Sequence, residues 1–165
     1  MGGAYMTFIS TSGSNQTITA LDSKGHEVAQ LIVQSTGRKD FQLYRSSAAT
    51  KHPAQTDAVV KASHSMLSGK TDLTVHGQRV TVRQSWEGMR SGKDLDTPNG
   101  KFEWRTGGST LHSVEELTDK RTGVKVASCR IPSFRKGDMK LEVLTPLDES
   151  LLDTIVASWI VMLAD

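Results

Sequence analysis

The basic side chains of one predicted strand are the residues best suited to chemistry in this chain. Arg79 and Arg83 lie within residues 78–86, where apolar and polar residues alternate. Because successive side chains of a strand point to opposite faces, the two arginines project from the same face. Guanidinium groups bind phosphate through charge-assisted, often bidentate hydrogen bonds. We therefore predict that Arg79 and Arg83, with Arg90 and Lys93 from the segment that follows, bind the headgroup of an anionic membrane lipid such as a phosphoinositide.

The same residues also fit an ordinary solvated barrel exterior, because the outward positions of a barrel are polar in any case. Further basic residues are spread over other predicted strands and turns: Arg105, Lys125, Arg130, Arg135, Lys136 and Lys140. Acidic residues lie among them and weaken any patch: Glu103, Glu115, Glu116 and Glu142. The chain has 20 basic and 18 acidic residues and a net charge of +2. This balance argues against a nucleic-acid-binding protein.

No group of residues has the spacing of a catalytic or metal site. Glu115 and Glu116 are adjacent in a predicted strand and point to opposite faces, so they cannot act together. Cys129 is the single cysteine and fits a small buried side chain better than a nucleophile. The chain contains no G-x-S-x-G motif. The five histidines lack the spacing with acidic partners that a metal site needs: His26, His52, His64, His76 and His112. We expect no enzyme, no cofactor and no metal.

An enzyme that uses the two long predicted loops, residues 45–56 and 87–100, is the alternative. It would need a convergent site among Asp94, Asp96, His52 and His112. Asp94 and Asp96 share a face only if their loop is extended.

The last 21 residues, 145–165, predict the core of the fold. Thr145 is expected to cap a helix, with Pro146 at its first position. From Ile155 onward the helix is apolar around its whole circumference except at Ser158, so it must be buried on all sides. Its apolar run is shorter than the roughly 18–20 residues that a membrane span needs.

The rest of the chain reads as β-structure. Predicted strands lie at residues 5–10, 16–21, 26–34, 41–44, 58–63, 71–75, 78–86, 102–105, 111–117, 124–131 and 139–144. A sheet curled around the helix would bury it. We therefore predict a single domain spanning residues 1–165, mainly β, folded as a closed antiparallel barrel of about ten to twelve strands that encloses the C-terminal helix.

The second half of the chain resembles a family of uncharacterised fungal proteins grouped with the tubby C-terminal domain, the phospholipid scramblases and the LURP-one-related plant proteins. The resemblance covers roughly residues 100–165. It rests on the strand Phe102-Glu103-Trp104, the turn followed by GVKVA, the short LEVL strand and the terminal helix. It implies a barrel with the helix threaded through its middle. Relatives in that group bind phosphoinositides or act on phospholipids, but none of their functional residues can be aligned here.

These observations predict a non-enzymatic barrel that binds lipid headgroups or a protein partner on its outer surface. A carrier with a small molecule or lipid inside the barrel is an alternative. The lone cysteine and the lack of a signal-peptide pattern favour the cytoplasm, with peripheral attachment to membranes and no transmembrane span.

Overall fold

The computed structural model describes residues 4–11, 16–37, 40–46, 58–65, 69–87, 90–107, 112–132 and 139–163. Within these ranges it has twelve strands and one helix. They are β1 (Met6–Thr11), β2 (Gln16–Leu21), β3 (Glu27–Gly37), β4 (Asp40–Ser46), β5 (Val60–Ser65), β6 (Lys70–Val75), β7 (Gln78–Glu87), β8 (Arg90–Thr97), β9 (Gly100–Gly107), β10 (His112–Asp119), β11 (Lys125–Pro132), β12 (Met139–Val143) and α1 (Glu149–Leu163).

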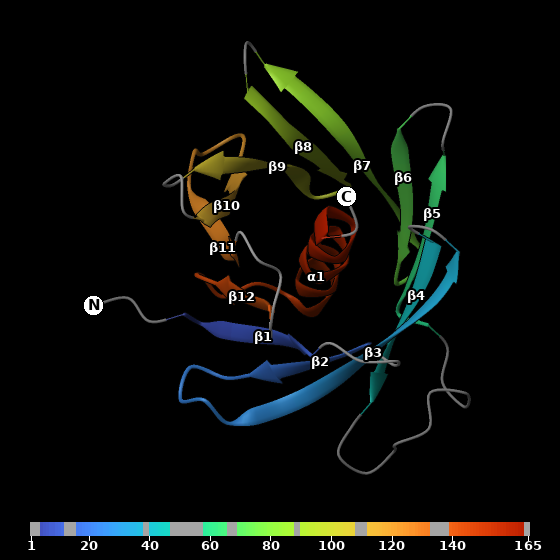
Figure 1. Ribbon diagram of the computed structural model, residues 1–165, viewed down its shortest axis with the longest axis vertical. Coiled ribbons are helices and arrows are strands. Elements are labelled where there is room, and N and C mark those ends of the chain that lie inside the picture. Colours follow the sequence, from blue (N-terminus) through green and yellow to red (C-terminus); the bar gives the residue numbers. More distant parts are fainter. Residues whose placement is uncertain are drawn as a thin grey trace.

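The strands form one closed antiparallel barrel (Figure 1). Each strand pairs with its neighbours in the sequence, and β1 pairs with β12 to close the ring. The closing register sets Met6 opposite Val143 and Ser10 opposite Met139. Closure satisfies the hydrogen-bonding groups that an edge strand would expose. The predicted fold class is confirmed.

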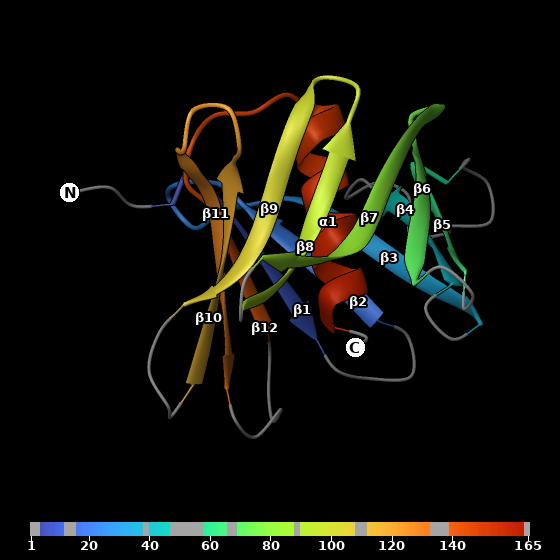
Figure 2. The ribbon, with the colours of Figure 1, turned by 90° about the horizontal axis from the view of Figure 1, so that it is seen from above.

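Helix α1 lies inside the ring of strands in Figure 1 and runs along the barrel in Figure 2. Ile155, Val156 and Trp159 are completely buried, as the all-round apolar pattern predicts. The strands meet the helix with their inward rows, in which every second side chain is apolar and buried, for example Leu73 and Val75 of β6. The helix therefore occupies the space in which a lipocalin-type barrel would hold its ligand.

The helix begins later than predicted. Its cap is Asp148, whose Oδ1 accepts the backbone N–H of Leu151 at 2.8 Å, so Thr145 as the cap was wrong. The N–H of Leu144 still bonds to the carbonyl of Val126 at 2.9 Å at the edge of the wall. The chain needs the next few residues to turn from the wall into the interior before a helix can start.

The predicted loop at residues 87–100 is also wrong for most of its length, because residues 90–97 form β8 between β7 and β9. Among the β8 side chains that the structure describes, residues 92–97, Leu95 alone is fully buried, while Asp94 and Asp96 take the outward positions. A steric clash explains why position 92 is a glycine, because a Cβ there would lie 2.4 Å from the carbonyl oxygen of Trp104. The glycine and aspartates that suggested a loop are thus features of a wall strand.

Candidate functional site

The first candidate site is the outer surface of the β6–β7 hairpin. Arg79 and Arg83 are both exposed on β7, whereas Val80 and Val82 between them are each 2% exposed and face inward. The two arginines therefore share the outer face, as predicted. They are four residues apart, which is about 13 Å along a strand.

The strand register brings two lysines to the same surface. Lys70 of β6 lies directly opposite Arg83, and Lys61 of β5 lies in the row of Arg79, with Thr74 between them. We call Lys61, Lys70, Arg79 and Arg83 the outer cationic face. Side chains directly opposite on neighbouring strands have Cβ atoms about 5 Å apart, so Lys70 and Arg83 can reach one anion together.

Arg79 and Arg83 form no ion pairs within the described part of the chain. Lys70 has a carboxylate neighbour, because its Nζ lies 3.5 Å from Oδ1 of Asp72. Neither Arg79 nor Arg83 forms an ion pair with another described residue. As far as the described residues go, the two exposed guanidinium groups are available to an external anion.

Arg90 and Lys93 were predicted to extend this surface from a loop, but both lie in a strand of the barrel wall. Both lie in β8, and the side chain of Arg90 is outside the described part. Lys93 is opposite Trp104 and in the same alternate row as the buried Leu95, so it belongs to the inward row. Asp94 is the β8 residue opposite Arg83, and it binds Nζ of Lys120 at 3.2 Å. The outer cationic face therefore ends at β8.

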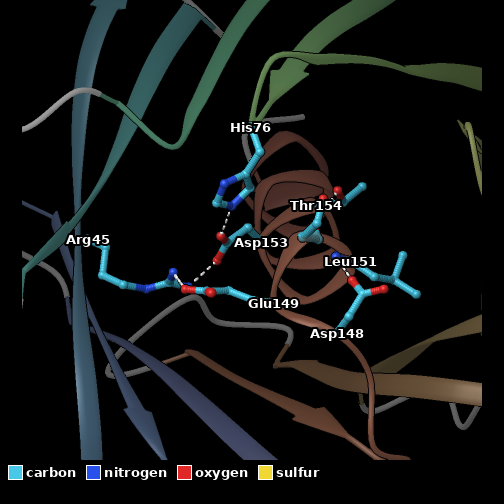
Figure 3. Close-up of polar contacts among 8 residues, drawn as sticks. Arg45, His76, Asp148, Glu149, Leu151, Asp153 and Thr154 are labelled. Carbon is cyan, nitrogen blue, oxygen red and sulfur yellow. Dashed lines mark hydrogen bonds and ion pairs between the residues drawn. The ribbon is translucent and has the colours of Figure 1, made fainter.

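The second candidate site lies at the end of the barrel where α1 begins, which we call the mouth. Asp153 of α1 is only 1% exposed. Its Oδ1 accepts a hydrogen bond from Nη2 of Arg45 at 2.5 Å, and its Oδ2 lies 2.7 Å from Nε2 of His76. Arg45 also pairs with Glu149 (Figure 3). We call Arg45, His76, Glu149 and Asp153 the mouth cluster.

Three separate elements position the mouth cluster. Arg45 is near the end of β4, in the inward row of the buried Leu43. His76 stands in the turn between β6 and β7 with φ of 48°, followed by Gly77 with φ of 81°. Two successive positive φ angles are typical of the tight hairpin turn that matches strand twist. His76 is the one non-glycine residue of the described part with positive φ, a conformation that costs roughly 1–2 kcal/mol. The bond to Asp153 offsets this cost.

Burial raises the pKa of Asp153, while the hydrogen bond from His76 and the charge of Arg45 oppose the rise. An aspartate that orients a histidine is also part of hydrolase active sites. Here, however, Asp153 is the one side chain of the described part that bonds to the His76 ring. No three potential metal-ligating side chains gather anywhere in that part. The mouth cluster is thus arranged to hold the helix against β4 and the β6–β7 turn.

The sequence prediction did not include Asp153. Its signal was a carboxylate directly before the apolar stretch of the helix, because a buried charge needs partners. Arg45 and His76 are 108 and 77 residues away, so the spacing in the sequence does not reveal them.

The remaining predicted sites are not brought together. Cys129 is buried in β11, and burial, with the charge of Glu115 adding to it, raises the pKa of its thiol to about 12. Asp94 and Asp96 do share a face of β8. His52 lies outside the described residues, as do Arg135 and Lys136, and His112 begins β10 with a side chain that is not described.

Comparison of the chain with protein-family models, with curated proteins and with solved structures finds no match. The resemblance to tubby-like proteins therefore stays a prediction. Among the described residues, no helix has both the length and the apolar character to cross a membrane.

Proposed function

We propose that the protein is a non-enzymatic barrel that binds phosphate-bearing headgroups of anionic membrane lipids through its outer cationic face. The observation that carries the proposal is the exposure of Arg79 and Arg83 on one outward row, without ion pairs to other described residues and with Lys70 opposite Arg83. The predicted resemblance implies the same class of ligand. A cytoplasmic location fits it, because the anionic leaflet faces the cytoplasm.

Simple electrostatics gives the expected strength. A basic residue near an anionic membrane contributes about 1 kcal/mol, so four of them supply about 4 kcal/mol at low salt. Alone, this corresponds to binding in the range of about 1 mM, which a second contact or a high lipid density must strengthen. Salt screens the attraction over about 8–10 Å, so the protein should leave the membrane as ionic strength rises.

The filled interior argues for the outer surface over a carrier function. Trp159 and Trp104, each at most 1% exposed, pack there, and the indole N–H of Trp104 donates to Oγ of Ser158 at 2.9 Å. A lipid chain would have to displace these side chains.

Liposome flotation tests the proposal. The wild-type protein should float at low salt with vesicles that contain phosphatidylinositol bisphosphate or phosphatidylserine, and stay behind with phosphatidylcholine alone. The variant Arg79→Glu/Arg83→Glu should lose binding. A matched control is Arg130→Glu/Lys140→Glu, which reverses two exposed charges that lie opposite each other on β11 and β12.

Two results would contradict the proposal. One is the absence of wild-type binding to any anionic vesicle at low salt. The other is an equal loss of binding in the β7 variant and the control, which would indicate a diffuse charge effect. Binding to an acidic protein without binding to vesicles would favour a protein partner instead.

A further inference from the structure

A small pocket lies at the end of the barrel opposite the mouth. Asp40 begins β4 and Leu163 ends α1, whereas Arg45 and Glu149 of the mouth cluster lie at or near the other ends of the same two elements. Figure 2 shows α1 running along the barrel between these two ends. The pocket has a volume of about 190 Å³, and residues of β2, β3, β4 and α1 line it. We call it the base pocket.

The wall of the base pocket is mostly apolar. Val33, Phe41 and Ile160 are buried, and Leu163 adds a fourth apolar side chain. A cavity of about 150 Å³ holds one benzene molecule. The base pocket therefore has room for one ring or a short alkyl group, and not for the length of a lipid chain.

The polar side of the base pocket consists of Gln16, Ser35 and Asp40, which are at least partly exposed to solvent. Oδ1 of Asp40 accepts the backbone N–H of His64 at 2.7 Å, and Oδ2 has no hydrogen bond or ion pair with a described residue. Nε2 of Gln16 donates to Oγ of Ser10 at 2.9 Å, which leaves the amide oxygen without a partner in that part of the chain. Two acceptors are thus unused, and none of the described residues that line the pocket is basic.

The end of α1 makes the same region more negative. The C-terminus of a helix carries about half an elementary negative charge, and cations near it are stabilised. The last turn of α1 contains no basic residue that would neutralise this charge. Together with the carboxylate of Asp40, the helix end favours a ligand that carries both a positive charge and hydrogen-bond donors. An ammonium group has both.

We propose that the base pocket binds a small primary amine, whose ammonium group pairs with Asp40 and donates to the amide oxygen of Gln16 while its aryl or short alkyl body lies against Phe41 and Ile160. The site does not use the outer cationic face, so its test is separate from the test of membrane binding.

NMR titration of the full chain at pH 7 tests the proposal with three ligands that share one ring and differ in charge. They are benzylammonium, benzyl alcohol and benzoate. Benzylammonium should bind about tenfold more tightly than benzyl alcohol, because a hydrogen bond to a charged group contributes about that much, and benzoate should bind most weakly. The largest shift changes should be those of the amides of Phe41, Ile160 and Leu163.

Three variants locate the binding. Asp40→Asn keeps an oxygen for the N–H of His64 but loses the charge, so it should weaken benzylammonium binding about tenfold and leave benzyl alcohol binding unchanged. Asp96→Asn, which removes an outward carboxylate of β8, is the matched control and should leave both affinities unchanged. Ser35→Leu places a larger side chain at the edge of the pocket and should weaken the binding of both ligands.

Four results would overturn the proposal: no binding of benzylammonium, benzoate binding as tight as that of benzylammonium, equal losses in Asp40→Asn and Asp96→Asn, or shift changes confined to the mouth cluster. If Asp40→Asn does not fold, the comparison of the three ligands in the wild-type protein and in Ser35→Leu still decides.

Discussion

The β6–β7 hairpin carries basic residues at its turn and on its outer surface, and the two groups differ in burial and in partners. At its turn, His76 reaches into the mouth and bonds to Asp153, whose side chain is 2% exposed. On its outer surface, Arg79 and Arg83 point to solvent without ion pairs to other described residues. Asp153 is paired and excluded from water, whereas Arg79 and Arg83 are exposed to it.

The physical consequences differ accordingly. Removing one member of a buried pair leaves an uncompensated charge, which costs stability. Removing a hydrated surface charge changes stability by at most about 0.5 kcal/mol, but it changes the attraction to a charged partner. We therefore assign the mouth cluster to the stability of the fold, and the outer cationic face stays our proposed binding surface.

The largest effect is expected from a charge placed in the core of α1. Trp159→Asp should prevent folding, because it forces an unpaired carboxylate into a fully buried site. Ile160→Ala should lower the free energy of unfolding by about 2–5 kcal/mol. Val124→Ala on the surface is the control and should change it by less than about 0.5 kcal/mol. Chemical denaturation checks all three, and an Ile160→Ala protein as stable as wild type would mean that α1 is not core.

A smaller loss is expected from Asp153→Ala. It should lower the free energy of unfolding by about 1.5–3 kcal/mol, the contribution of a hydrogen bond to a charged group, because the partners left behind are partly exposed and Arg45 keeps Glu149. Replacing both partners, as in Arg45→Met/Asp153→Leu, should cost less than the single change. Denaturant unfolding measures the free energy of unfolding of both variants. A double variant less stable than Asp153→Ala would contradict the idea that the cost comes from a broken ion pair.

The smallest effect concerns Cys129, an uncharged inner residue. With a pKa of about 12 and a buried side chain, its thiol should resist alkylation in the native protein at pH 8 and react once denaturant is added. Cys129→Ser should leave membrane binding unchanged. Labelling followed by mass spectrometry measures the rate, and rapid native labelling would show that β11 opens readily.

The sequence predicted most of the fold because two of its patterns are local. The all-round apolar stretch after Ile155 requires a surrounding wall, and the alternation in β7 assigns Arg79 and Arg83 to one face. The errors arose where pairing with distant strands decides the structure. Residues 90–97 have little apolar character of their own and become a strand because β7 and β9 flank them.

The residues of the candidate sites also fall into those that local periodicity places and those that depend on distant pairing. Arg79 and Arg83 could be placed from strand periodicity, and Lys61 follows from the same rule applied to β5, where it is outward and exposed. The inward row of Lys93 could not be assigned while its segment was read as a loop. The partners of Asp153 depend on the closed barrel, which brings β4 and the β6–β7 turn to the start of the helix.

The most direct test of the central claim measures stability and binding in the same two variants. Asp153→Ala should lower the melting temperature by several degrees, and when still folded it should float with anionic vesicles like wild type. Arg79→Glu/Arg83→Glu should melt close to the wild-type temperature and fail to float. The account is contradicted if the β7 variant binds anionic vesicles as well as wild type does, or if it loses as much stability as Asp153→Ala.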